Sequence, residues 1–352
     1  MRPYNVGIAG STGLVGQRLV ARVASHPWFR LVALGASERS SGSSYREAVR
    51  WMLPEPIPEH AASLVVSGCA PKDFAACDLV LSALDAPIAI EVEPALSRAG
   101  LAVVSNSSAL RMDPAVPLLV PEVNGAHAAR IASRAGAGFV VTNPNCSVTG
   151  LALALAPLDL AFGVKRLVVA TMQSVSGAGI AGPRAIDLLD NVVPYIANEE
   201  EKIEAELGKI LGRATADGFA SAEIVVSAHC HRVPTLDGHL EAVSVELRKA
   251  ATPEEAMEAM TSFRGDTEGL GLPSAPPSPI IVRREPDRPQ TRLDRDSGAG
   301  MSVVVGRMRT CPVMTLRFVL LSHNMVRGAA GGALLNAELL AARGLLPQRS
   351  RA

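Results

Sequence analysis

The sequence predicts an α/β protein whose first part is a doubly wound parallel sheet. An apolar run at 4–9 ends in the glycine-rich segment 10–16, and residues 14–23 then show the apolar spacing of a helix. Further apolar runs lie at 31–34, 63–66, 78–83 and 101–105, with a helical pattern at 88–98. Strands that alternate with helices form parallel sheets. Because the pattern changes beyond residue 146, we expect a Rossmann-like domain followed by a second, α+β domain.

The composition is that of a soluble globular enzyme. The chain has 352 residues, enough for two domains with cores of their own, and is 48% hydrophobic and 19% charged. Its 34 basic and 34 acidic residues cancel and aromatics make up only 3%, so nothing favours a nucleic-acid or membrane partner. Five scattered cysteines without metal-ligand spacing indicate free thiols, and no apolar stretch could span a bilayer. We therefore expect a cytoplasmic protein with no metal site.

The glycine-rich segment after the first apolar run predicts a dinucleotide site. Glycines in this position allow a tight turn, a close approach to a pyrophosphate, and close packing of helix on strand. The alternative is a glycine turn without a nucleotide, which many α/β proteins contain. The expected contacts are Gly10, Ser11, Thr12, Gly13, Leu14 and Val15.

The loop after 31–34 indicates which dinucleotide binds. NAD-binding folds usually place an acidic residue here, whereas this chain has Ser37, Arg39 and Ser40. Hydroxyls and a guanidinium suit a 2′-phosphate, so the sequence favours NADP(H), although Glu38 opposes this and a plain solvated loop is the alternative. Ser82 and Ala83 end a later strand, where such sheets bind ligands.

The segment 143–150 contains the candidate nucleophile. Cys146 stands where a strand gives way to a long Ala/Leu-rich helix, so unpaired backbone N–H groups and the helix dipole should favour its thiolate near neutral pH. The same N–H groups, with the Asn145 side chain, could hold an oxyanion formed by attack on a carbonyl. The alternative is a small buried apolar cysteine.

Beyond Cys146 we expect a strand at 167–172, a small-residue loop at 173–179, and a helix that Asn198 caps in a box with Glu201. The acidic first turn of that helix has a plain alternative role, which is to face solvent and satisfy the dipole.

Further along the chain, the runs 223–228 and 239–247 read as paired strands joined at an Asp-Gly turn, and three histidines cluster there, at 229, 231 and 239. We interpret them as holding a general acid/base, not a metal. A capped helix begins at Thr252, 272–279 is a proline-rich connector, and strands follow at 301–309 and 314–321. A last helix at 328–343 should pack on the first domain.

Taken together, the ordered motifs resemble the aspartate-β-semialdehyde dehydrogenase family over nearly the whole chain. The resemblance is closer to its archaeal and fungal branch than to the enterobacterial one. It rests on 10–16, 107–111, 143–147, Gln173 with 176–179, 199–202, Arg232 seven residues before His239, and Asn324 before a closing Arg-Gly-Ala-Ala-Gly.

The resemblance implies the catalytic roles. Cys146 would attack the acyl phosphate of L-aspartyl-4-phosphate, Gln173 would position the thiol, Asn145 would help to hold the oxyanion, and His239 would act as acid/base, giving a thioester that NADPH reduces to L-aspartate-4-semialdehyde. His231 could compete with His239. The reaction would serve lysine, threonine and methionine biosynthesis.

The resemblance also implies the binding roles. Arg232 would bind the substrate α-carboxylate, Glu199 its ammonium group, and Arg111 with Lys202 the phosphate, although a second pair, Glu206 and Lys209, could blur that assignment and a lone arginine such as Arg111 is often a surface charge. Two cationic sites and one anionic site match such a substrate. Ser176, Gly177 and Asn324 would contact the cofactor.

Residues 1–145 with 323–352 would form the NADP-binding domain, and 146–322 the catalytic and dimerisation domain of a dimer or tetramer. Two alternatives remain open, namely a malonyl-CoA reductase on the same scaffold and a non-catalytic NADP-binding protein. An N-acetyl-glutamyl-phosphate reductase is disfavoured, because that family usually has Gly where Asn145 stands.

Overall fold

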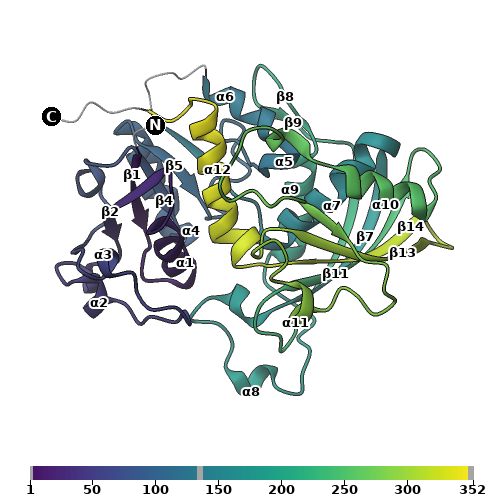
Figure 1. Cartoon of the computed structure of the whole chain (residues 1–352), viewed down its shortest axis with the longest axis horizontal. Coiled ribbons are helices and arrows are strands. Elements are labelled where there is room, and N and C mark those ends of the chain that lie inside the picture. Colours follow the sequence, from purple (N-terminus) through teal and green to yellow (C-terminus); the bar gives the residue numbers. More distant parts are fainter. Residues whose placement is uncertain (1–2, 133–137, 348–352) are drawn as a thin grey trace.

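Two sheets make up the protein in this computed structural model, which describes residues 3–132 and 138–347 (Figure 1). The first sheet is parallel throughout, with the order β3-β2-β1-β4-β5-β6. Its strands are β1 Tyr4–Ala9, β2 Phe29–Gly35, β3 Val66–Ser67, β4 Leu79–Ser82, β5 Ala102–Ser105 and β6 Phe139–Thr142. This confirms the predicted doubly wound sheet.

Helices cover both faces of the first sheet. Leu19 and Val23 of α1 (Leu14–Val23) pack on the face that Leu81 presents, whereas Leu96 of α4 (Ala86–Arg98) packs on the opposite face with Val80. Shorter helices lie in the connections, at α2 Tyr45–Ala48, α3 Glu59–Ala62, α5 Pro121–Asn124 and α6 Ala129–Ala132. The strand expected at 63–66 is displaced, because 59–62 form α3 and β3 begins only at Val66.

The second sheet is mixed, with the order β10-β7-β11-β14-β13-β12. Its strands are β7 Val164–Gln173, β10 Val225–Arg232, β11 His239–Leu247, β12 Ile280–Val282, β13 Val303–Thr310 and β14 Leu316–Ser322. One face packs on α7 (Cys146–Phe162), α9 (Glu199–Ile210) and α10 (Pro253–Ser262), which share a buried cluster with it. The remaining elements are α8 Ala185–Leu188, α11 Thr291–Asp294 and a small ribbon of β8 Arg213–Ala214 with β9 Phe219–Ala220.

The expected hairpin between the strands near 228 and 239 is wrong, because β7 lies between them. β10 runs parallel to β7 and pairs Arg232 with Gln173, whereas β11 runs antiparallel to β7 and pairs Leu240 with Met172. The connection 233–238 passes over the end of β7, to which it is bonded by the Val233 N–H and the Gln173 carbonyl. This crossing brings the ends of three strands together.

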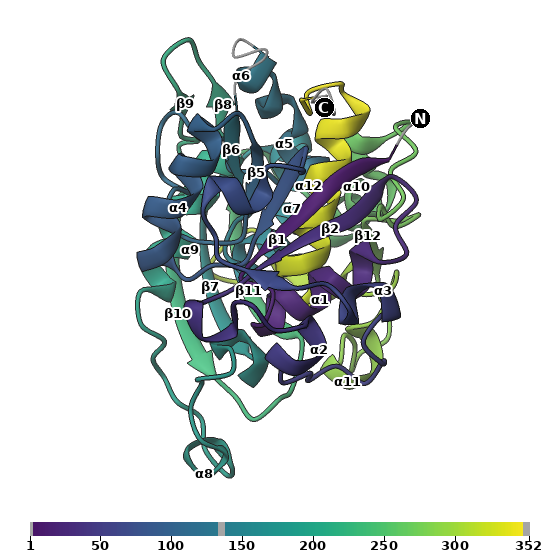
Figure 2. The same ribbon diagram turned by 90° about the vertical axis from the view of Figure 1, so that its left-hand side faces the viewer.

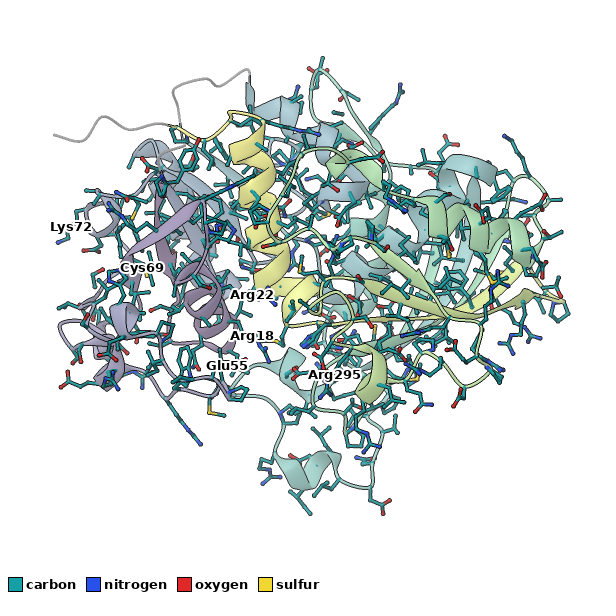
Figure 3. The ribbon with its side chains drawn as sticks, viewed as in Figure 1. Arg18, Arg22, Glu55, Cys69, Lys72 and Arg295 are labelled. Atoms are coloured by element: carbon teal, nitrogen blue, oxygen red, sulfur yellow. The ribbon has the colours of Figure 1, made fainter. Side chains whose placement is uncertain are left out.

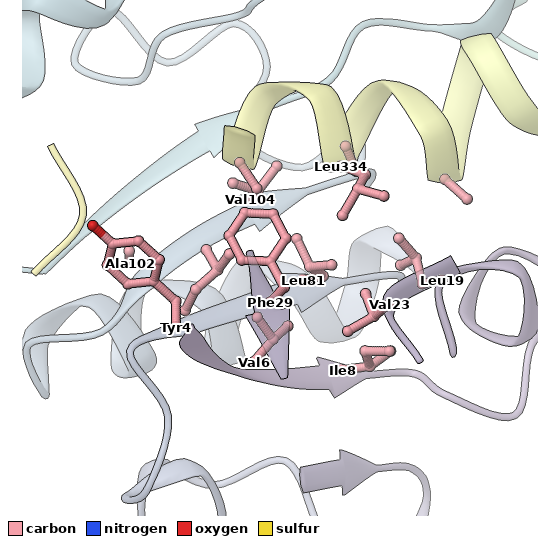
Figure 4. Packing of buried hydrophobic residues seen from close by; sticks show 14 of the residues in the cluster. Tyr4, Val6, Ile8, Leu19, Val23, Phe29, Leu81, Ala102, Val104 and Leu334 are labelled. Atoms are coloured by element: carbon pink, nitrogen blue, oxygen red, sulfur yellow. The ribbon is translucent and has the colours of Figure 1, made fainter. Parts of the chain in front are cut away.

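The C-terminal helix α12 (Gly331–Ala342) lies between the two sheets (Figures 1 and 2). Leu334 packs over Phe29 and Val104 of the first sheet (Figure 4). A π-helical turn, Val326–Ala330, precedes α12, so the α-helix starts three residues later than the expected 328. Of the expected closing segment 323–352, residues 348–352 lie outside the described part.

Within the described ranges, no helix is both long and apolar enough to cross a bilayer.

Candidate active site

Cys146 is the first residue of α7, and Asn145 caps that helix. Asn145 Oδ1 accepts hydrogen bonds from the N–H groups of Ser147, at 2.9 Å, and Val148, at 3.4 Å. Asn145 Nδ2 in turn donates to Glu199 Oε2 at 2.7 Å. The cap therefore occupies the Asn145 amide and two of the backbone N–H groups that we expected to hold an oxyanion.

The terminal residues of three strands lie in one row next to Cys146: the last residues of β7 and β10 and the first residue of β11. Arg232 of β10 and Gln173 of β7 are register partners, and His239 opens β11 beside them. Because side chains alternate along a strand, all three point to the α7 face of the sheet. His239 Nε2 lies 3.2 Å from Cys146 Sγ.

The row borders a cavity of about 440 Å³ between the two sheets. Every residue expected to act in catalysis or to bind substrate lines it except His239, which contacts Cys146 from below. The predicted residues along its wall are Arg111, Asn145, Cys146, Gln173, Glu199, Lys202 and Arg232.

The thiolate expected at Cys146 is not supported. Burial, with the Glu199 carboxylate second, raises the pKa of the Cys146 thiol to about 12 against the opposing effects of Arg111 and Arg232. Burial lowers the pKa of His239 to about 3, helped by the Arg232 and His323 side chains. At neutral pH the free site thus holds a thiol beside a neutral imidazole.

Glu199 points into the site and not to solvent, so the plain alternative is wrong for Glu199, whereas Glu201 of the same turn is exposed. Its Oε2 accepts from Asn145 and, at 3.2 Å, from Gln173 Nε2, while Oε1 accepts from Lys202 Nζ at 3.0 Å. Burial raises the pKa of Glu199, but Lys202 and these hydrogen bonds outweigh it and leave the pKa below its usual value. The expected capping box is absent, since Asn198 has φ +60° and makes no side-chain cap.

Arg111 and Lys202 are two further cations that line the cavity. Arg111 Nη1 donates to Glu206 Oε1, and Nη2 donates to the Asn106 carbonyl, both at 2.9 Å. Lys209 Nζ instead donates to three backbone carbonyls, those of Arg111, Asp113 and Val116. Lys209 is thereby occupied away from the cavity, which favours Lys202 as the anion-binding lysine of α9.

The three clustered histidines separate. His229 is exposed and His231 half-buried on the face of β10 that points away from α7, whereas His239 is buried next to Cys146. Of the three histidines, only His239 thus lies next to Cys146. Over the described residues, no group of three or more His, Cys, Asp or Glu is arranged to hold a metal ion.

A second cavity of about 490 Å³ adjoins the first at Val15 and Gly177. The predicted cofactor contacts on its wall are Gly13, Leu14, Val15, Ala83, Ser176 and Gly177. Gly10 has φ +79°, and a Cβ there would lie 2.6 Å from the Ala83 carbonyl oxygen, so the turn needs glycine. A flat ring and a pyrophosphate fit this cradle of backbone and small side chains.

The remaining expected cofactor residues lie around this cradle. Ser11 and Ser82 are fully buried, and Ser11 Oγ donates to the Gly35 carbonyl, so Ser11 supports the turn from within the protein. Ser37 and Arg39 are exposed and Ser40 is partly exposed, just after β2. This position beside the glycine turn suits a group at the far end of a dinucleotide.

Comparison with known proteins decides the family. A family model described as "Semialdehyde dehydrogenase, NAD binding domain" matches residues 5–131, and one described as "Semialdehyde dehydrogenase, dimerisation domain" matches 155–327. The aspartate-semialdehyde dehydrogenase of Archaeoglobus fulgidus is 47% identical over 96% of this chain and 98% of its own length. The chain belongs to the aspartate-semialdehyde dehydrogenase family.

Other members of the aspartate-semialdehyde dehydrogenase family agree. The Cryptococcus neoformans enzyme is 45% identical over 97% of this chain and 98% of its own. The crystal structure of the Candida albicans enzyme with NADP superimposes with a TM-score of 0.91 at 41% identity, covering 97% of this chain and all of that one. Vibrio cholerae aspartate semialdehyde dehydrogenase II gives 0.78 at 28% identity, over 97% of this chain and 99% of its own. The expected resemblance to archaeal and fungal members is confirmed.

Within this family member, Asn324 is a bridge between two loops of the site. Its Nδ2 donates to Ser176 Oγ at 2.9 Å, and its Oδ1 accepts from the Gly238 N–H at 2.8 Å. Arg18 of α1 meets Asp237 of the same turn at 3.5 Å, across the seam where Figure 3 shows Arg18 and Arg295. The turn that leads to His239 is thus held from both domains.

Sequence reasoning missed two contributors to the site, Asn106 and Ser174, and named Glu206 only as one of a pair that could blur the lysine assignment. Glu206 holds both Arg111 and the Asn145 N–H, the latter at 2.6 Å, Asn106 positions Arg111, and Ser174 contacts His239. Glu206 lies two helical turns after Glu199, so the helical period offered a signal for it. Asn106 contacts Arg111 through its backbone carbonyl, and Ser174 contacts His239 through its backbone N–H. No sequence pattern indicates such backbone contacts.

Proposed function

We propose that the chain catalyses the NADPH-dependent reductive dephosphorylation of L-aspartyl-4-phosphate to L-aspartate-4-semialdehyde, and the reverse phosphate-dependent oxidation. The observation that carries the proposal is the Cys146 Sγ to His239 Nε2 contact of 3.2 Å in a cavity lined by Arg111, Lys202, Glu199 and Arg232. A nucleophile, a proton-bearing group and four charged anchors converge there.

The charges fit the two ends of the substrate. Arg232 lies beside Gln173, and its guanidinium suits the α-carboxylate, while the Glu199 carboxylate suits the ammonium group. Arg111 and Lys202 suit the phosphate. Since Glu199 stays ionised, it supplies the one negative charge that an ammonium group requires.

Cys146 and His239 have different roles in the reaction. Cys146 Sγ forms a thioester with the acyl carbon as phosphate leaves. His239 Nε2 is close enough to hold or hand over a proton at the sulfur or at the adjacent carbonyl oxygen. A bound nicotinamide supplies the hydride, a chemistry that side chains lack. Gly177 leaves room for it, because a Cβ there would lie 3.1 Å from Arg232 and 3.2 Å from His239.

For the cofactor we propose NADP(H), held at Gly10–Val15 with its 2′-phosphate near Ser37, Arg39 and Ser40. The exposure of these side chains after β2 and the NADP complex of the Candida relative support this choice. We also propose a homo-oligomer, because a dimerisation-domain model covers the second sheet, and a cytoplasmic location, because the five cysteines are all free.

The test is nicotinamide absorbance on mixing the protein with aspartate semialdehyde, phosphate and NADP. We expect a phosphate-dependent signal that disappears in Cys146→Ala. A protein that binds NADP yet gives no signal would contradict the proposal, and malonyl-CoA with NADPH would then be the next substrate tried.

A further inference from the structure

Helix α9 carries two glutamate and lysine pairs with the same spacing, seven residues apart. The first pair, Glu199 and Lys202, lines the cavity beside Cys146. The second pair, Glu206 and Lys209, is almost fully buried two helical turns further on, and it does not belong to the described lining of that cavity. The second pair therefore acts on the site through the residues that it contacts.

Glu206 bonds two residues of the site at once. Its Oε1 accepts from Arg111 Nη1 at 2.9 Å, and its Oε2 accepts from the backbone N–H of Asn145 at 2.6 Å. Asn145 caps α7 directly before Cys146. One carboxylate therefore joins the guanidinium that we assign to the phosphate to the start of the helix that carries the nucleophile.

Lys209 holds the main chain of the same arginine. Its Nζ donates to the carbonyl oxygen of Arg111 at 2.7 Å and to those of Asp113 and Val116, both at 2.8 Å. Arg111 Nη2 donates in turn to the Asn106 carbonyl at 2.9 Å. The guanidinium is therefore held by two acceptors and the backbone of Arg111 by a third contact, so the position of this side chain in the cavity is fixed.

The Glu206 carboxylate also balances the charge of Arg111. Both side chains are almost entirely buried, so water and salt screen this pair less than they screen a pair at the surface. An anion in the cavity is therefore attracted by a guanidinium whose charge is already offset in part. Phosphate would enter this position in one direction of the proposed reaction and leave it in the other, so a moderate attraction serves both directions.

We propose that Glu206 is a positioning residue, which fixes Arg111 relative to Cys146 and limits the attraction of Arg111 for an anion. The inference rests on the proposed function, because that function identifies the anion as the phosphate of the substrate. An acyl phosphate held by Arg111 presents its acyl carbon to the sulfur at a distance that the guanidinium sets. Misplacement of reacting groups by about 1 Å can cost about 100-fold in rate, so a carboxylate that bonds both sides of this distance controls the rate.

Alkylation of Cys146 tests the charge role without a substrate, so its outcome does not depend on the proposed function. Iodoacetamide and iodoacetate react with a thiol in the same way, but only iodoacetate is an anion. Changes in the ionisation or the exposure of Cys146 alter both rates, whereas a change in the charge of the cavity alters their ratio. We expect Glu206→Gln to raise the rate with iodoacetate relative to iodoacetamide by about threefold or more, because Arg111 loses its counter-charge.

Mass spectrometry of the Cys146 peptide measures both rates, and Glu201→Gln on the exposed face of α9 is the matched control, with an unchanged ratio. If Glu206→Gln does not fold, the same comparison uses Arg111→Gln with and without Glu206→Gln, since the double variant leaves neither member of this buried pair charged and unpaired. The double variant should then give the higher ratio. A ratio that Glu206→Gln leaves unchanged, in either background, would overturn the charge role.

Glu206→Asp tests the positioning role. It keeps the charge beside Arg111 but is one methylene shorter, so it reaches only one of its two partners. We expect kcat with aspartate semialdehyde, phosphate and NADP to fall by about tenfold or more per alkylatable Cys146, while KM for phosphate stays within about twofold. A purely structural role would lower the number of folded molecules and not the kcat of each one, so an unchanged kcat per Cys146 would overturn the positioning role. If the unmodified protein itself shows no activity, the proposed function fails, and the alkylation ratio still decides whether Glu206 balances Arg111.

Discussion

The resting state of Cys146 follows from its neighbours. Helix position favours a thiolate, yet Asn145 Oδ1 already satisfies two N–H groups at the start of α7, and burial and Glu199 oppose the charge. Since the pKa lies near 12, the thiolate fraction rises with pH across the whole neutral range. We expect alkylation of Cys146 by iodoacetamide, followed by mass spectrometry of its peptide, to speed up about tenfold per pH unit through about pH 9. A plateau with a midpoint near neutrality would contradict this.

Glu199 has two effects on the site, and the substitution Glu199→Gln tests both through two different measurements. Glu199→Gln removes the charge that suits the substrate ammonium, so KM for aspartate semialdehyde should rise by about tenfold or more. The same change removes the charge that raises the pKa of Cys146, so alkylation at neutral pH should accelerate. The matched control is Glu201→Gln on the exposed face of the same helix. Slower alkylation in Glu199→Gln would refute the electrostatic account.

The chemical role of a residue was predictable where its neighbours in the sequence determine that role. A cysteine between a strand and a helix indicated the nucleophile, whereas the cap that Asn145 forms on α7 was not predicted. The ionisation states of Cys146 and His239 were not predictable, because they depend on Glu199 and Arg232, which are remote in sequence. The contact of Ser174 with His239 was equally hidden, since it is made in part by a backbone N–H.

At the scale of elements, the turn η1 (Glu38–Ser40) carries the cofactor preference that we propose. Arg39→Ala should raise KM for NADP by about tenfold or more and leave KM for NAD nearly unchanged, because only NADP has the 2′-phosphate. Steady-state rates with each cofactor measure both constants. The exposed Arg46, which pairs with Glu59 on the surface, gives the control Arg46→Ala. Equal effects on the two cofactors would contradict the proposed contact.

The buried pair Arg327–Glu122 joins the turn before α12 to α5. Both guanidinium Nη atoms donate to the carboxylate, each at 2.6 Å, and both side chains are almost fully buried. Glu122→Gln should lower the free energy of unfolding by about 3 kcal/mol or more, because it leaves a buried charge unpaired. Urea unfolding measures this, with Glu59→Gln in the exposed pair as control, expected to change stability by less than about 1 kcal/mol. Similar losses in the two variants would contradict the account.

Element boundaries followed from sequence wherever a cap or an apolar run was complete. Thr252 does cap α10 in a box with Glu255. The pairing of β10 and β11 with β7 was mispredicted because an Asp-Gly pair is a local signal. The strand that lies between them, β7, comes 59 residues before its register partners in β10. Asn198 was misread because its capping partner, Glu201, faces solvent and Glu199 is drawn inward.

At the scale of the whole molecule, the two sheets meet at the site. The outward face of the second sheet, opposite α7, exposes apolar side chains. The parallel sheet was predictable because its strands and helices alternate along the chain, but the position of α12 between the sheets depends on contacts with residues far away, such as Asn336 Nδ2 to Asn143 Oδ1 at 2.6 Å. That contact ties the last helix to the loop before Cys146. The two domains therefore share the positioning of the nucleophile.

The outward face of the second sheet is where we expect a second copy to bind. Opposite α7, this face exposes Val168 and Ala242 on adjacent central strands, and the dimerisation-domain model spans it. A central sheet face without a covering layer exposes apolar area that association would bury. Ala242→Arg adds a charge there, which an apolar interface excludes, so sedimentation should show a smaller species than the unmodified protein gives.

Ser262→Arg adds the same charge on exposed α10, across the sheet from this face, and should leave the sedimentation unchanged. Because Cys146, His239 and Arg232 all come from one chain, Ala242→Arg should still bind NADP, and its residual kcat reports how far the second copy supports the strand ends behind the site. An assembly that keeps its mass in Ala242→Arg would place the interface elsewhere, and the exposed apolar side chains around α8, Ile186 and Leu189 among them, would be the next surface to test.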